Sequence, residues 1–172
     1  MTAAPSAALL AVVAEVEAHL SEAGWDQPPQ LFALVDTEEL LRAEPQLATS
    51  MGLVVTRPGA LTPIAQDPLR PDDLDEQLAA VVFGPEVLGV VIAHEVLVLP
   101  PSAEAAVGDD VDAAVAHPER REVRMAVGVM RDGSRESVLR LRAAGEDDDE
   151  LVTGGDLAPG LADALMSTLD ES

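Results

Sequence analysis

The sequence predicts a single α+β domain over residues 1–172, with helices packed on a mostly antiparallel sheet of about five or six strands. Hydrophobic residues make up 48% of the 172 residues, which is enough to bury a core. Apolar residues recur at the helical period in some segments, whereas in others they form short runs that are typical of buried strands. Neither an internal repeat nor a convincing boundary divides the chain, so we expect one domain.

The first half of the chain alternates helical and extended segments. Residues 5–23 carry apolar side chains at the helical period, and Gly24 suits the end of a helix. After the stiff connector "WDQPPQ", "LFALV" is typical of a buried strand. Asp36 and Glu39 match a capping box for a short helix over 37–43 that ends before Pro45. "GLVVTRPGALTPIAQ" then indicates two short strands around a turn at Pro58-Gly59.

The second half continues the same alternation. "DDLDEQLAAVVF" begins with acidic residues, which suit a helix N-terminus, and Gly84-Pro85 ends that helix. "LGVVIAHEVLVL" predicts a long strand in which His94 and Glu95 point to opposite faces, and we expect His94 to be a structural residue with its hydrogen bonds satisfied. "GDDVDAAVAHP" predicts a short helix, "GEDDDE" a loop, and the last segment a helix capped by Asp156.

Seven of the ten arginines lie in residues 119–142, in a chain with 32 acidic residues and no lysine. This segment predicts a hairpin about Asp132-Gly133. A two-residue loop would place the valines of the first strand and the leucines of the second on opposite faces. A three-residue loop, 131–133, with Gly133 left-handed, places both sets toward the core. Arg124 then lies opposite Arg140, and Glu122 opposite Arg142.

Three interpretations of this hairpin stay open, because like charges directly opposite each other cost stability unless they are neutralised. It is a solvated ladder screened by Glu122 and the acidic run 146–150, an anion or carboxylate site, or a contact surface for an acidic partner or another copy of the chain. His117, just before the arginines, is the best single candidate for proton transfer. The candidate binding residues are Arg121, Arg124, Arg140, Arg142 and His117.

Charge and composition argue against several classes of function. A formal net charge of −22 repels nucleic acid and anionic membranes, and one Trp and two Phe leave few rings for base stacking. The absence of cysteine excludes disulfides and thiol catalysis. The acidic segments lack the calcium-loop pattern, and no catalytic or phosphate-loop signature is present. We therefore expect no cofactor and no metal site. Glu15 and Glu17 interrupt the first apolar segment, which favours an amphipathic helix over an export signal.

Four segments, "GWDQPPQLFALV", "LVLPP", "HPERREVRMAVGVMRDG" and "DLAPGLADAL", resemble a conserved family of uncharacterised actinobacterial proteins over nearly the whole chain. The resemblance implies a cytoplasmic actinobacterial protein and no particular activity. The sequence favours a non-enzymatic protein that binds a protein partner or associates with itself. The alternative is a binder of, or an enzyme on, an anionic small metabolite, with a pocket where the arginines and His117 converge.

Overall fold

A computed structural model describes residues 5–50, 52, 60–70, 73–98, 105, 108, 113, 121–142, 150–154 and 158–169. Its strands form one antiparallel sheet in the order β2-β1-β3-β4-β5-β6. The predicted α+β fold with a sheet of five or six strands is confirmed, and that residues 1–172 form one domain stays a prediction. The strands are β1 (Gln30–Asp36), β2 (Leu61–Ala65), β3 (Gly89–Val98), β4 (Arg121–Met130), β5 (Arg135–Leu141) and β6 (Glu150–Gly154).

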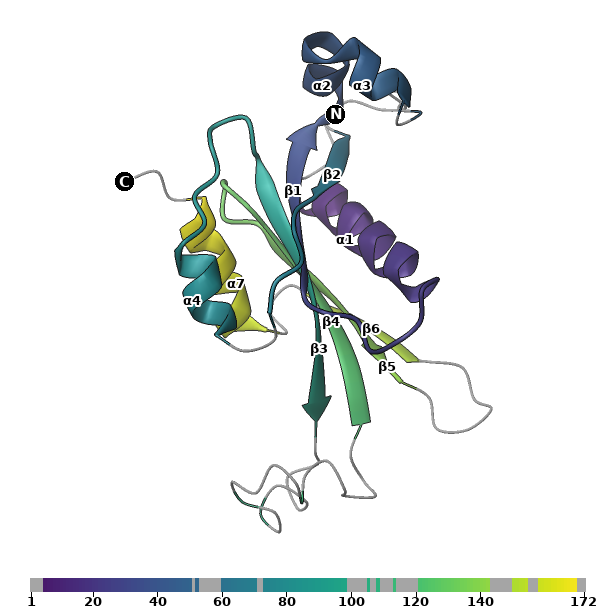
Figure 1. Ribbon diagram of the computed structural model, residues 1–172, viewed down its shortest axis with the longest axis vertical. Helices are drawn as coiled ribbons and strands as arrows, with labels where there is room; N and C mark the ends of the chain where they lie inside the picture. Colours follow the sequence, from purple (N-terminus) through teal and green to yellow (C-terminus); the bar gives the residue numbers. More distant parts are fainter. Residues whose placement is uncertain are drawn as a thin grey trace.

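Helices pack on both faces of this sheet (Figure 1). α1 (Pro5–Ser21) lies on one face, and α4 (Leu74–Ala79) and α7 (Pro159–Thr168) lie side by side on the other. α2 (Thr37–Ala43) and α3 (Pro45–Ser50) sit together beyond one end of β1 and β2. No helix among the described residues is both long enough and apolar enough to cross a membrane.

The two faces carry separate hydrophobic cores. Val90 and Ile92 of β3 pack with Val127 of β4 under α4 and α7. Val91 of β3 and Ala126 of β4 pack against α1 on the other face. Successive residues of β3 and β4 are therefore buried on opposite sides, which is why these central strands contain nearly continuous apolar runs.

The register of the β4–β5 hairpin is the predicted one. Val123 pairs with Leu141, and Arg124 pairs with Arg140. Gly133 has a φ of +96°, as the three-residue loop requires. The interpretation of this hairpin as a solvated ladder is wrong for Arg124, which is buried beneath α1, whereas Glu122 and Arg142 on the same face are partly exposed.

Several predicted boundaries need correction. α1 ends at Ser21, two residues earlier than predicted. α4 ends at Ala79, short of the predicted Phe83, whose N–H donates instead to the carbonyl of Thr168 at 2.8 Å. Pro45 follows the end of α2, as predicted, and it also begins a further helix, α3, which agrees with the preference of proline for a first helical position.

Two corrections concern the last part of the chain. α7 begins at Pro159 with Ala158 at the cap position, so Asp156 is not the capping residue. Glu150, expected in a loop, begins β6. Other predictions lie outside the described residues: the strand before Pro58-Gly59, that turn, most of the helix over 108–117 and the acidic residues 146–149.

The capping box is confirmed in its first half. Asp36 accepts a hydrogen bond from the backbone N–H of Glu39 at 3.1 Å, and α2 covers the predicted residues 37–43. This cap turns the chain into α2 at the end of β1.

Candidate functional site

The opposed arginines of the hairpin are neutralised by Glu17, which reaches down from α1. Arg140 donates from Nε and Nη2 to the two carboxylate oxygens of Glu17, with 2.9 Å between Nη2 and Oε2. Arg124 Nη1 lies 3.7 Å from Glu17 Oε1. The side chains of Arg124 and Glu17 are each only 2% exposed. One buried carboxylate therefore separates two guanidinium groups that would otherwise repel each other.

The ionised state of Glu17 is favoured by these partners. Burial alone would raise the pKa of Glu17, but hydrogen bonds from Arg140 and Ser21 and the charges of Arg140 and Arg124 outweigh it. The pKa of Glu17 therefore lies below its ordinary value. α1 is thus held to the sheet by charge as well as by apolar contacts.

Arg124 also fastens the connector between α1 and β1. Its Nη2 donates to the carbonyl of Gly24 and lies 3.3 Å from Glu95 Oε2. Glu95 in turn accepts from the backbone N–H groups of Asp26 at 2.8 Å and Gln27 at 2.9 Å. Asp26 has a positive φ of 68°, a conformation that these bonds help to hold.

The only tryptophan of the chain packs over this network. The ring of Trp25 lies 4.8 Å from Arg124 Cζ and 5.5 Å from Arg142 Cζ, both within cation–π range. Arg142 also hydrogen-bonds Glu122, the partner that the register predicted. The strands, the connector and α1 thus meet around these arginines.

A further arginine, Arg131, joins the hairpin loop to the segments that follow α4 and α7. Arg131 donates from Nε to the carbonyl of Val87 at 2.7 Å, and from Nη2 to the carbonyl of Gly84 at 2.8 Å. It also donates to the carbonyls of Phe83 at 3.2 Å and Leu169 at 2.5 Å. Sequence reasoning placed Arg131 in the loop and assigned it no contact.

The structure brings three of the five predicted site residues together: Arg124, Arg140 and Arg142. The side chain of Arg121 and the whole of His117 lie outside the described residues. A solvated ladder is wrong for Arg124, since it is buried beneath α1. Whether these arginines bind an anion or a partner is untested and stays a prediction. A ligand at Arg124 would have to displace Glu17 or Glu95.

Glu17 is the residue of this network that sequence reasoning missed. It lies on α1 beside Val13, Val16 and Leu20, which are all buried. A carboxylate inside an apolar stripe needs a positive partner, so the sequence did hold a signal. The apolar stripe alone does not indicate which arginine is that partner.

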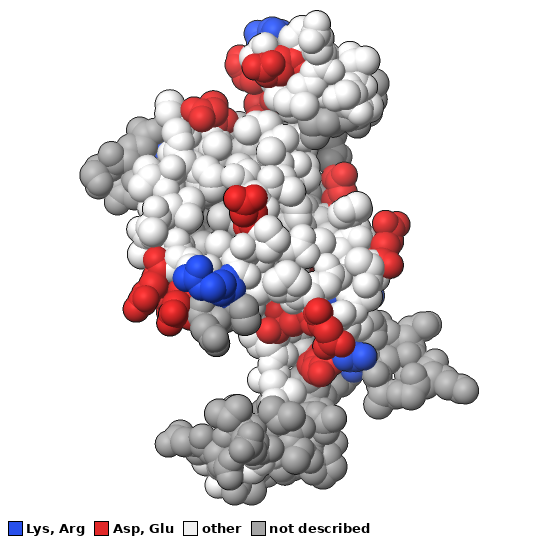
Figure 2. Space-filling view, viewed as in Figure 1, with Lys and Arg blue, Asp and Glu red and all other residues white. Residues whose placement is uncertain are grey.

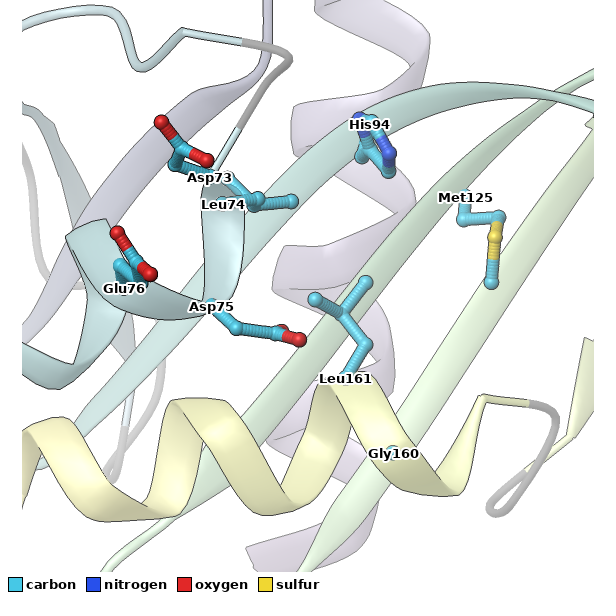
Figure 3. Close-up of a pocket in the computed structure, with 8 residues that line it drawn as sticks. All are labelled: Asp73, Leu74, Asp75, Glu76, His94, Met125, Gly160 and Leu161. Atoms are coloured by element: carbon cyan, nitrogen blue, oxygen red, sulfur yellow. The ribbon is translucent and has the colours of Figure 1, made fainter.

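A cleft of about 640 Å³ opens on the other face of the sheet, between α4 and α7. Figure 3 shows Leu74, His94 and Leu161 around this space, with Met125 beside them on β4. Asp75 is directed toward Leu161, whereas Asp73 and Glu76 lie toward the rim. The inside of the cleft is thus lined by apolar side chains, His94 and the Asp75 side chain, and its mouth is acidic.

His94 forms the floor of the cleft. Its Nδ1 is buried and has no hydrogen-bond partner in the described part of the chain, so the expectation of a satisfied histidine is wrong for this nitrogen. Burial lowers the pKa of His94, against the charge of Glu95, which raises it. The ring is therefore neutral at neutral pH. Glu95 points to the opposite face, as predicted, where it binds the connector.

The outer strand β6 is exposed along its length. Leu151 is 53% exposed and Val152 is 38% exposed. Within the described residues β6 pairs with β5 alone, so its outer edge carries backbone groups that no described strand pairs with. Figure 2 shows acidic side chains spread over the visible face of the molecule and basic ones at only a few places.

Comparison with known proteins gives one family. The model of the PPA1309-like protein family matches residues 9–170. The matched span contains all six strands, α4, α7, α1 from residue 9 onward and the arginine network. No curated protein and no solved structure matches the chain.

Proposed function

We propose that this chain, which belongs to the PPA1309-like protein family, is a non-enzymatic binding protein that docks a basic, extended segment of a partner protein along β6. The observation that carries the proposal is the exposed edge strand with two exposed apolar side chains. The resemblance noted above supports two further parts of the proposal: the protein is soluble and cytoplasmic, and the family is restricted to actinobacteria.

Addition of a strand to a sheet edge is a common mode of peptide recognition, in which backbone hydrogen bonds supply affinity and alternate side chains supply specificity. Leu151 pairs with Arg140 and so lies on the α1 face, while Val152 pairs with Leu139 and lies on the other face. An added strand would therefore find one exposed apolar contact on each face of the sheet.

The charge of the chain supports a basic partner over a second copy. Five consecutive acidic residues, 146–150, lead into β6, and the formal net charge of the chain is −22. Two copies would repel each other at this edge, whereas a segment rich in arginine or lysine would be attracted. Arg124 and Arg140 contact Glu17 inside the protein, which argues against them as the surface for an acidic partner.

The test is the binding of a labelled ten-residue peptide of alternating arginine and valine, measured by fluorescence anisotropy at low and high salt. A peptide with glutamate in place of arginine is the charge control. We expect the basic peptide to bind and its affinity to fall with salt. Val152→Asp should weaken binding even though it adds negative charge, because it removes an apolar contact. Val82→Asp is the matched control, since Val82 is 67% exposed but distant in sequence from β6.

Two results would overturn the proposal. One is equal binding of the basic peptide by the Val152→Asp and Val82→Asp variants, which would mean that charge alone, without a specific contact at β6, attracts the peptide. The other is a wild-type dimer in sedimentation velocity that Val152→Asp dissociates, which would make the partner a second copy.

A further inference from the structure

We infer that the cleft between α4 and α7 binds a small organic cation, a primary ammonium group that carries an apolar body. This site lies on the face of the sheet opposite α1 and is independent of the proposed docking edge at β6.

The lining fits an apolar body of limited size. Leu74 from α4, Leu161 from α7 and Met125 from β4 contribute apolar side chains around a volume of about 640 Å³. Volumes of this order are typical of small-molecule sites, which are mostly apolar and contain a few polar groups. Contact with these three side chains would remove apolar surface of the ligand from water.

The charged groups fit a cation. Asp73, Asp75 and Glu76 line the cleft, and no arginine is among its described lining residues. None of these three carboxylates forms an ion pair in the part of the chain that the structure describes. Asp75 is directed across the cleft toward α7, so its carboxylate lies where a bound ammonium group can meet it (Figure 3).

The arrangement favours an organic cation over a metal ion. No three carboxylate or imidazole side chains of the described residues lie together in a group that could hold a metal. The apolar lining would also gain nothing from a bare ion, whereas it would contact the body of an amine. His94 lines the floor of the cleft as a neutral ring, so it does not repel a cation.

The experiment is a titration of the whole chain with phenethylammonium chloride at pH 7.5, followed through the imidazole C–H signals in the proton NMR spectrum. The chain has three histidines, so the signals are few, and His94→Gln identifies the one that belongs to His94. We expect saturable movement of the His94 signal. Sodium chloride at equal ionic strength and the neutral analogue phenethyl alcohol should leave this signal in place.

Asp75→Asn tests the role assigned to the carboxylate. Loss of a charge-assisted hydrogen bond should weaken phenethylammonium binding about tenfold. Both Asp75 and the control residue Glu38, on α2 at the far end of the sheet, are exposed, so neither substitution threatens the core. Glu38→Gln removes the same charge from the whole molecule and should leave the affinity unchanged.

Three results would overturn the inference: no movement of the His94 signal, equal movement with phenethyl alcohol, or equal weakening by Asp75→Asn and Glu38→Gln. Because β6 takes no part in the cleft, Val152→Asp should bind phenethylammonium like the wild type. Failure at β6 and failure at the cleft are therefore distinguishable.

Discussion

Replacement of Glu17 by glutamine should destabilise the protein strongly, although the two side chains have nearly the same shape. The substitution removes the carboxylate that lies between Arg124 and Arg140 and leaves their positive charges facing each other beneath α1. Arg124 is 2% exposed and Arg140 19% exposed, so water screens the first of these charges very little.

The magnitude follows from this burial. Removal of one partner from a buried ion pair costs about 3–5 kcal/mol in free energy of unfolding. Glutamine can still accept one hydrogen bond, and Arg140 is partly in contact with water, so we expect the lower part of that range, about 3 kcal/mol. Proteins of this kind are stable by only about 5–15 kcal/mol. The loss is therefore a large share of the total.

Urea denaturation measures this loss directly. Trp25 is the only tryptophan and lies 4.8 Å from Arg124 Cζ, so its fluorescence reports on the network, while far-ultraviolet circular dichroism reports on the whole fold. With a slope of about 2 kcal/mol per M urea, the midpoint should fall by roughly 1.5 M. Coincident transitions by the two signals would confirm that the loss is global.

The control is Glu22→Gln, just beyond the end of the same helix. The side chain of Glu22 is 80% exposed and lies 3.8 Å from His19, so we expect a change below about 0.5 kcal/mol. The double substitution Glu17→Gln with Arg140→Gln should recover part of the loss, since it also removes one of the opposed charges. Equal midpoints for Glu17→Gln and Glu22→Gln would refute the account of this network.

Three further predictions concern other contacts. Burial lowers the pKa of His94, so below about pH 6.5 the unfolded chain takes up a proton that the folded chain does not, and the free energy of unfolding should decrease as the pH is lowered from 7 to 5. His94→Gln should reduce this decrease in urea midpoints, and an unchanged dependence on pH would contradict the prediction. Gly128→Ala would place a Cβ 2.5 Å from Val13 Cγ2 on α1 and should cost about 1–3 kcal/mol in thermal unfolding, whereas Gly160→Ala, with no atom within 4 Å, should cost nothing. Arg131→Lys should cost about 1–2 kcal/mol, because a single ammonium group cannot reach all of its carbonyl partners; a melting temperature equal to that of Arg42→Lys, an exposed control, would refute this.

Local pattern was enough to predict much of the fold. The Asp36 cap and the alternation in residues 123–129 and 139–141 depend on neighbours in sequence, and the structure bears out the cap at Asp36 and the register of the two strands. We did not predict that helices cover both faces of the sheet, although the sequence of β3 indicates it. Residues 90–93 are apolar without interruption, which is typical of a strand buried on both sides.

The candidate sites were harder to predict from the sequence, because they depend on contacts between segments that are distant along the chain. The register correctly placed Arg124 opposite Arg140, but the neutralising acid came from a helix and not from the acidic run beside the hairpin. The cleft at His94 exists only because α4 and α7 meet on one face, and no local pattern states which helices become neighbours.

The pairing of Glu17 with Arg140 has a consequence for how the chain folds as it is made. The two residues are 123 positions apart, and α1 leaves the ribosome well before the strands on which it packs. At about 5–20 residues per second, α1 would wait on the order of 6–25 s for β5 to be synthesised. During that interval its apolar stripe and Glu17 have none of their β4 and β5 partners. Contacts of such long range also slow folding. The N-terminal helix is therefore exposed in the nascent chain while β4 and β5 are synthesised, and we expect its docking on these strands to be a late step of folding.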